Sequence, residues 1–367
     1  MWRRSEENQQ RRPDALEVPP APTSCVTTDG PVLAVYRITT ADHTQTGLLA
    51  DVKVAAWEAR RVRGHEHTRY AKEEALLAEL DDVEALVGPV ALGHRPEPEL
   101  GALLEGLSSG RRTASWESAG ETLHELWVVE GTKLEELATR SAALDPLYIV
   151  DGHHRIAAAA RRAAGRHAAT ADDDPWGAFL AAVFPADQLV VRAIHRIVDV
   201  AGAGTPDALL GRLEALGTLT SVDGPEDARA RRKKQFGVGF AGRWYRLDIR
   251  PSAGRSCPDA QLLDELVLGP VLGIDDPRND MRIDFFPDLG DLRPVAERCR
   301  DTNEIAFLVR PLAVDEVFAI ADSGAALPPK STWFDPKPIK GAVMPAQRLP
   351  ERAWGPQSLL EASRPAG

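Results

Sequence analysis

The most informative segment of the chain is Leu147-Tyr148-Ile149-Val150-Asp151-Gly152-His153-His154-Arg155-Ile156. A short apolar run ends in five polar or flexible residues, and an alanine-rich segment over 157–164 follows. This pattern predicts a strand over 147–150, a tight turn, and a helix over 156–164 with residues 152–155 at its N-terminal edge.

The predicted turn has the chemistry of an anion site. A helix N-terminus presents backbone N–H groups, and the helix dipole favours negative charge there. Gly152 allows a sharp bend or the close approach of a ligand, and Arg155 can hold a phosphate or carboxylate with two parallel hydrogen bonds. The alternative is an ordinary turn, in which Asp151 caps the helix or pairs with Arg155 and the basic residues are solvated.

The composition indicates a globular protein without a nucleic-acid surface. The 367 residues are 43% hydrophobic and 27% charged, with a formal net charge of −11, which argues against non-specific DNA binding. No apolar run approaches the roughly 18 residues of a membrane span. The three cysteines, Cys25, Cys257 and Cys299, are far apart in sequence and favour a reducing compartment. We therefore expect a cytoplasmic protein.

Hydrophobic patterning along the rest of the chain predicts strands and helices in alternation, without an internal repeat. Strands are expected over 31–38, 46–54, 88–92, 123–129, 179–184, 189–191, 237–240 and 244–249, and helices over 70–86, 100–107, 133–137 and 207–216. Segments 305–309 and 317–321 complete the second half, and the basic run 228–234 is expected to be a solvated helix end or loop. The predicted parts are a disordered arm (1–24), a core (25–170), a C-terminal α+β domain (171–350) and a flexible tail (351–367).

Four blocks of the sequence resemble the DUF1015 family, and they occur in that family's order. The blocks are Gln45-Thr46-Gly47-Leu48 with Arg63-Gly64-His65-Glu66-His67-Thr68-Arg69, then Asp151 to Arg155, then Ala193-Ile194-His195-Arg196-Ile197-Val198, and finally Pro328-Pro329-Lys330-Ser331-Thr332-Trp333-Phe334-Asp335-Pro336-Lys337. The family normally begins with a longer N-terminal region, which the residues before Pro31 do not match. Serine-kinase relatives carry their catalytic carboxylate near the N-terminus. By this comparison the chain lacks that group, recruits another carboxylate, or has a misassigned start, and each alternative weakens the case for a kinase.

The resemblance implies an α+β fold with a ParB/sulfiredoxin-like nucleotide-binding core and a second α+β domain. Members of that superfamily bind or hydrolyse CTP, reduce sulfinylated cysteine with ATP, or phosphorylate free serine. By this fold-level analogy, Gly152, His153, His154 and Arg155 would bind the nucleotide, which is ATP, ADP or CTP. Mg²⁺ would be held by Glu66 and Asp151.

Further residues of the four blocks are candidates for chemistry. Glu66 can act as a general base or hold Mg²⁺ beside phosphates, or it can simply cap the following helix. Catalytic roles are expected for Glu66, Asp151 and His153, and substrate contacts for His65, Thr68, Arg69, His195, Arg196, Lys330, Ser331, Thr332 and Lys337. Residues 66, 151–155, 195 and 330–332 are expected to share one cleft.

Two of these features have alternatives. Prolines on both sides of Lys330-Ser331-Thr332 pre-organise the lysine and hydroxyls for an anion, or the loop packs Trp333 and Phe334 into the core. His65 and His67, joined by His153 and His154, could form a transition-metal site, but no carboxylate triad accompanies them.

The sequence therefore predicts an ATP-dependent phosphotransferase acting on a small hydroxyl-bearing metabolite, free serine or a similar amino acid. The alternative is a non-catalytic nucleotide-binding regulatory or scaffold protein. DNA binding in the ParB manner is disfavoured by the acidic charge. The expected partners are a nucleotide and a small substrate, with homodimerisation as an option.

Overall fold

The computed structural model describes residues 26–28, 32–83, 88–118, 121–165, 177–250, 257–277, 279–328, 330–340 and 343–345. The chain forms two compact units, the first made of Met1–Leu189 with Pro336–Gly367 and the second of Val190–Asp335. The predicted arm (1–24) and tail (351–367) lie outside the described residues.

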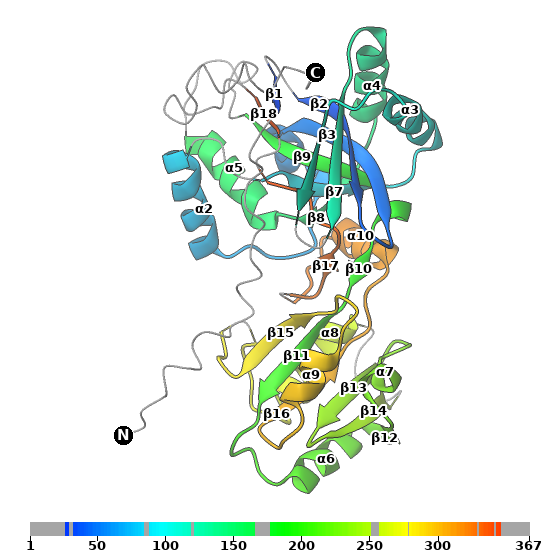
Figure 1. Ribbon diagram of the computed structural model, residues 1–367. Coiled ribbons are helices and arrows are strands. Elements are labelled where there is room, and N and C mark those ends of the chain that lie inside the picture. Colours follow the sequence, from blue (N-terminus) through cyan, green and yellow to red (C-terminus); the bar gives the residue numbers. More distant parts are fainter. Residues whose placement is uncertain are drawn as a thin grey trace. The chain divides into compact units, whose positions relative to one another are not determined.

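The first unit is built on an eight-stranded sheet with the order β4-β8-β5-β9-β3-β2-β7-β6 (Figure 1). Its strands are β2 (Leu33–Thr39), β3 (Thr44–Lys53), β4 (Val62–Arg63), β5 (Val90–His94), β6 (Ala114–Ser118), β7 (Thr122–Val128), β8 (Leu147–Asp151) and β9 (Ala178–Pro185). The helices are α1 (Val54–Glu58), α2 (Tyr70–Val83), α3 (Pro98–Ser108), α4 (Thr132–Ala142) and α5 (His153–Gly165), with the short 3₁₀ turn η3 (Ala186–Gln188). A separate pair joins β1 (Val26–Thr28) and β18 (Val343–Pro345) in parallel.

The core of this unit lies between the sheet and its helices. Buried apolar side chains of β2, β3, β5, β8 and β9 form one cluster with Leu100 and Leu104 of α3, Leu137 of α4 and Ile156 of α5. The first sequence block requires glycine at position 47, because a Cβ there would lie 2.0 Å from the carbonyl oxygen of Val183 on β9. Only glycine allows β3 and β9 to approach this closely.

The predicted strand, turn and helix over 147–164 are confirmed. β8 ends at Asp151, Gly152 makes the turn, and α5 begins at His153. Helices α2 and α5 pack side by side (Figure 1). Their contacts run in the same direction along both helices, from Arg69 with His154 to Glu73 with Arg161. The two helices are therefore parallel, and their N-termini lie together.

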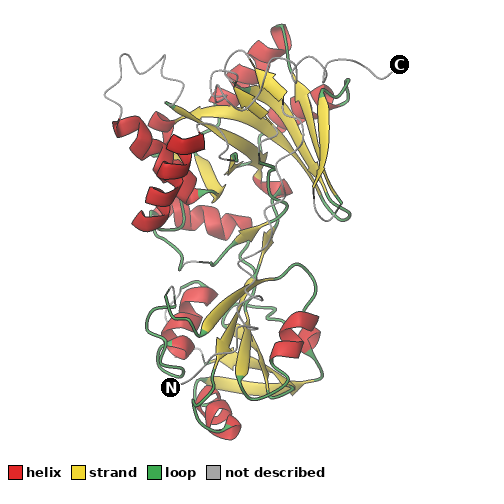
Figure 2. Cartoon of the chain, turned by 60° about the vertical axis from the view of Figure 1, so that its left-hand side comes forward, coloured by secondary structure: helices red, strands yellow, loops and turns green. Residues whose placement is uncertain are grey.

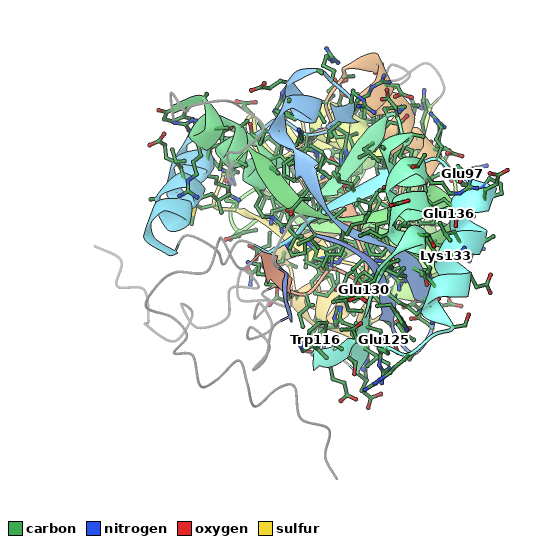
Figure 3. All side chains as sticks on the ribbon, turned by 90° about the horizontal axis from the view of Figure 1, so that it is seen from above. Glu97, Trp116, Glu125, Glu130, Lys133 and Glu136 are labelled. Atoms are coloured by element: carbon green, nitrogen blue, oxygen red, sulfur yellow. The ribbon has the colours of Figure 1, made fainter. Side chains whose placement is uncertain are left out.

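Acidic side chains gather on α3 and α4 and on the loops that precede them. Figure 3 shows Glu97, Glu130 and Glu136 there, together with Lys133. Glu97 caps α3 by accepting a hydrogen bond from the Leu100 amide, and Lys133 pairs with Glu136 at 2.8 Å. This region accounts for part of the negative net charge and contrasts with the turn before α5.

The second unit contains a six-stranded sheet with the order β12-β14-β13-β16-β11-β15. Figure 2 draws the strands of both units in yellow and the helices in red. Its strands are β11 (Ile194–Asp199), β12 (Gly217–Val222), β13 (Gln235–Phe240), β14 (Arg243–Ile249), β15 (Ile283–Pro287) and β16 (Glu304–Leu308). A small pair joins β10 (Val191–Arg192) and β17 (Trp333–Phe334). Helices are α6 (Pro206–Glu214), α7 (Pro225–Ala228), α8 (Asp259–Leu263), the π-helical turn η4 (Asp264–Leu268), α9 (Arg293–Arg298) and α10 (Val314–Ser323).

The α+β class predicted from the sequence is confirmed. The hairpin of β13 and β14 closes through Ala241 and Gly242, both at positive φ, as a tight two-residue hairpin turn requires. The predicted boundary near residue 170 differs from the observed one at Leu189, because β9 pairs between β3 and β5 and so belongs to the first unit. Within the described residues, no helix is long and apolar enough to cross a bilayer.

Candidate functional site

Gly152 shapes the turn between β8 and α5. Its φ of +104° lies in the region that favours glycine, and its carbonyl oxygen accepts hydrogen bonds from the amides of Arg155 (2.9 Å) and Ile156 (3.1 Å). A Cβ at position 152 would lie 3.0 Å from Nε of Arg155, so the guanidinium folds back over the turn. Both the backbone conformation and the space therefore demand glycine.

Arg155 is bound by acceptors of the protein itself. Nη1 donates to the carbonyl oxygens of Gly88, at 2.8 Å, and Pro89, and Nη2 donates to Oδ2 of Asp151. These contacts tie the start of α5 to the segment that leads into β5. The geometry matches the alternative in which Arg155 pairs with Asp151, and it makes Arg155 a residue that positions the turn.

Asp151 lies between two cations. Its Oδ2 accepts from Arg155, and its Oδ1 accepts from Nζ of Lys337 at 2.8 Å. Burial alone would raise the pKa of Asp151, but the charges of Arg155 and Lys337 outweigh it and lower this pKa to about 2. At neutral pH the three side chains carry charges of −1, +1 and +1, so a net charge of +1 remains at the N-terminus of α5.

The two histidines of the turn hold the block around residue 65. The amide of His65 donates to Nε2 of His153 at 3.2 Å, and the amide of Arg69 donates to Nε2 of His154 at 3.1 Å. An imidazole nitrogen that accepts a hydrogen bond carries no proton, so both rings are neutral with the proton on Nδ1. The rings of His65 and His153 also meet edge to face, with centroids 4.5 Å apart.

The electrostatics agree with neutral rings. Burial, followed by the neighbouring His65, lowers the pKa of His153 well below its ordinary value. Burial, followed by Lys72 and Arg69, also lowers the pKa of His154, and burial lowers that of His65 to about 4. This arrangement speaks against a proton-transfer role for His153 and gives both turn histidines a structural task.

The C-terminal block reaches the same site. Pro336 accepts a hydrogen bond from Nε2 of Gln45 at 3.3 Å, and the Ile339 amide donates to the Tyr36 hydroxyl at 3.1 Å. Between these two anchors, Lys337 meets Asp151. Residues of the first, second and fourth sequence blocks thus meet in one compact unit, around the turn of Asp151 to Arg155.

A family model for DUF1015, described as a protein of unknown function, matches residues 24–268. The chain belongs to the DUF1015 family. The resemblance found in the sequence is confirmed, although the Pro328–Lys337 block lies beyond the matched residues. No curated protein matches this DUF1015 protein.

Several solved structures are distantly similar to the DUF1015 protein. A free serine kinase variant in complex with ADP is 14% identical, with a TM-score of 0.44 and coverage of 90% of this chain and 99% of that one. C-terminally truncated SbnI from Staphylococcus aureus is 11% identical, with a TM-score of 0.44 and coverage of 86% and 93%. A conserved hypothetical protein from Pyrococcus furiosus is 13% identical, with a TM-score of 0.42 and coverage of 82% and 96%. Sequence identity and TM-score are low in all three comparisons.

The first unit brings together most of the predicted site residues. They are His65, Glu66, Thr68, Arg69, Asp151, Gly152, His153, His154, Arg155 and Lys337. The others, His195, Arg196, Lys330, Ser331 and Thr332, belong to the second unit, and their substrate contacts stay predictions. Sequence reasoning missed Gly88 and Pro89, although a Gly-Pro pair before a strand marks a turn that can face other elements.

His195 and Arg196 point to opposite faces of β11, because neighbours on a strand alternate between the two faces of the sheet. His195 accepts a hydrogen bond from the Val309 amide at 3.3 Å, and its Nε2 lies 3.4 Å from Oδ2 of Asp288. Arg196 is fully buried on the other face, with its guanidinium 5.2 Å from the ring centre of Phe285. The substrate contacts expected of His195 and Arg196, and the cleft expected to contain His195, stay predictions.

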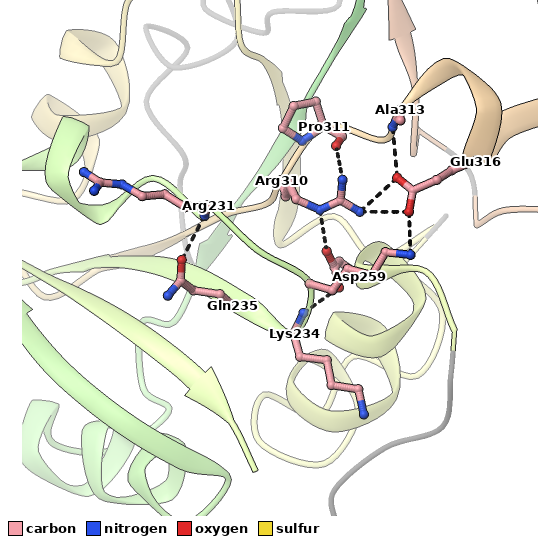
Figure 4. A network of polar contacts seen from close by, with 9 residues as sticks. Arg231, Lys234, Gln235, Asp259, Arg310, Pro311, Ala313 and Glu316 are labelled. Atoms are coloured by element: carbon pink, nitrogen blue, oxygen red, sulfur yellow. Dashed lines mark hydrogen bonds and ion pairs between the residues drawn. The ribbon is translucent and has the colours of Figure 1, made fainter. Parts of the chain in front are cut away.

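The basic run 228–234 forms the end of α7 and a loop, as predicted. Two of its exposed cations are paired: Arg232 with Asp248 at 2.7 Å, and Lys233 with Glu316 at 2.6 Å. Figure 4 shows the adjoining network, in which Asp259 accepts from the Lys234 amide and from Arg310, which in turn contacts Glu316. These acidic partners offset much of the positive charge of the run, which weakens the case for nucleic-acid binding there.

Proposed function

We propose that this protein binds a nucleotide through the N-terminus of α5 and transfers a phosphoryl group to a small hydroxyl-bearing metabolite, such as free serine. The observation that carries the proposal is the position of Asp151 between Arg155 and Lys337. It leaves net positive charge at a helix N-terminus in a chain whose net charge is −11. The helix dipole and the cations both attract an anion at this position.

The neighbouring helix α2 adds to the positive electrostatic potential at the N-terminus of α5. The N-terminus of α2 lies beside that of α5, because Arg69 donates its amide to His154. The charges of Arg69 and Lys72 act on His154 and disfavour its protonation. Two helix N-termini and these cations suit a polyphosphate better than a single carboxylate.

The roles of individual residues follow from their contacts. Lys337 has a side chain that is 40% exposed, so its ammonium can meet a phosphate while it stays beside Asp151. Arg155 fixes the turn, and His153 and His154 hold the 65–69 segment in place. Asp151, with its low pKa, is too weak a base to take a proton from a hydroxyl at neutral pH.

Glu66 is the carboxylate we assign to Mg²⁺ or to base catalysis. Both oxygens of Asp151 face cations, which does not suit a metal ligand. Among the residues that the structure describes, no group of three or more His, Cys, Asp or Glu could hold a metal ion. Mg²⁺ bound with phosphates needs only one or two protein carboxylates, and it would neutralise charge on the transferred group.

A second candidate is a nucleotide-binding protein without turnover. It is favoured by the structural use of His153, His154 and Asp151, which leaves Glu66 as the single acid of the predicted catalytic set.

A mass-spectrometric screen separates the two candidates. ATP, ADP and CTP are each incubated with the full chain, Mg²⁺ and a pool of amino acids and hydroxy acids. The phosphotransferase proposal expects one acceptor to gain one phosphate, and expects Glu66→Gln to abolish that product while nucleotide binding persists. Nucleotide binding without any phosphorylated acceptor would identify the non-catalytic protein.

A further inference from the structure

Tyr70 is an exposed aromatic residue beside the proposed phosphate site. It is the first residue of α2, and 69% of its surface is exposed. The preceding residue, Arg69, donates its amide to His154 at the N-terminus of α5. The backbone at the start of α2 therefore lies beside the N-terminus of α5, where the nucleotide phosphates are proposed to bind, and the Tyr70 ring lies against Arg161, about two turns further along α5.

The ring of Tyr70 is held from one side. The guanidinium carbon of Arg161 lies 4.5 Å from its centroid, and Nη2 of Arg161 lies 3.4 Å from its hydroxyl. Arg161 is fixed in turn by Glu74, and by Glu73 at 3.4 Å. The ring is thus ordered by an arginine from α5, while its large exposure leaves the opposite face open to solvent.

An ordered tyrosine with one open face can stack with a flat, uncharged ring. An arginine on the far side strengthens such stacks, because its charge polarises the aromatic system. Nucleobases stack on aromatic side chains in a way that tolerates any base, since every base has a π-face.

We propose that Tyr70, backed by Arg161, is the platform on which the nucleobase of the bound nucleotide stacks. This inference rests on the proposed function, because it places the base next to the phosphates at α5. It assigns affinity for the base to stacking and not to hydrogen bonds with the base edge. The protein is therefore expected to bind ATP and GTP with similar affinity, and to bind both more tightly than inorganic tripolyphosphate.

Calorimetric titration of the full chain tests this inference with tripolyphosphate, ATP and GTP as probes. For Tyr70→Ala we expect affinity for ATP and GTP to fall about tenfold to hundredfold, while affinity for tripolyphosphate stays unchanged. Tyr70→Phe should keep nearly all the affinity. Leu289→Ala removes another exposed apolar side chain (52% exposed) in the second unit and should change nothing.

These titrations distinguish a failure of the stacking platform from a failure of the phosphate site. Tripolyphosphate and ATP binding that are both unaltered in a folded Tyr70→Ala protein would overturn the stacking platform and leave the phosphate site standing. Equal affinity of the wild type for ATP and tripolyphosphate would do the same. Failure of the wild type to bind either probe would overturn the phosphate site, and the platform with it.

Discussion

Nζ of Lys337 lies 2.8 Å from Oδ1 of Asp151, although 186 positions separate the two residues in sequence. The second unit occupies most of that separation, and the chain returns to the first unit only at Pro336. Lys337 is thus delivered to the turn by the first residues after the return. The site therefore combines residues from both sequence segments of the first unit, Met1–Leu189 and Pro336–Gly367.

Removal of the Arg155 side chain should destabilise the fold. Arg155→Ala removes the guanidinium donors of the Gly88 and Pro89 carbonyls and of Oδ2 of Asp151, so we expect the free energy of unfolding to fall by about 2–4 kcal/mol. Arg155→Lys should recover only part of this loss, because an ammonium cannot reach all three acceptors in the same geometry. Urea unfolding of the two variants measures the effect. Wild-type stability in Arg155→Ala would show that the contacts contribute little.

Alanine at position 152 should destabilise the turn by about 1–3 kcal/mol, because φ of +104° is unfavourable for any residue with a Cβ. The new Cβ would also crowd Arg155. Gly106→Ala is the matched control: its position in α3 has no neighbouring atom within 4 Å, and alanine favours helix. Thermal melts should therefore move in opposite directions for the two variants, and equal shifts would contradict the role of Gly152.

Stability should fall as the pH drops below the ordinary histidine pKa of 6.5. Burial holds the pKa of His65 at about 4 and lowers those of His153 and His154, so the folded state favours neutral rings. The unfolded chain binds more protons below about pH 6.5, and the stabilisation, complete above that value, is lost as pH falls toward the folded pKa values.

Unfolding free energies measured between about pH 7.5 and pH 5 test this expectation. In His154→Gln the slope should be flatter by up to about 1.4 kcal/mol per pH unit, the contribution of one proton. An unchanged slope would mean that His154 does not resist protonation in the folded state.

The central elements could be predicted from the sequence because their signals are local. An apolar run, a glycine and an alanine-rich tract define β8, the turn and α5 without reference to the rest of the chain. The opposite directions of His195 and Arg196 were also predictable, since alternation is a property of any strand.

Other features depend on contacts between distant segments. The acceptors of Arg155 on Gly88 and Pro89 are 67 and 66 positions away, so the sequence left both a phosphate ligand and an internal ion pair open. The same holds for the histidines, whose residue type suggested metal or proton chemistry. Their use as hydrogen-bond acceptors for the 65–69 segment becomes visible only when α2 and α5 lie together.

Calorimetric titration of ATP into the wild type, Lys337→Gln and Lys133→Gln tests whether the N-terminus of α5 binds the nucleotide phosphates. Both variants remove one positive charge, but Lys133 pairs with Glu136 on α4, whereas Lys337 lies at the turn. We predict that Lys337→Gln lowers ATP affinity about five- to fiftyfold and that Lys133→Gln leaves it unchanged. Equal ATP affinity in all three folded proteins would contradict an anion site at the N-terminus of α5.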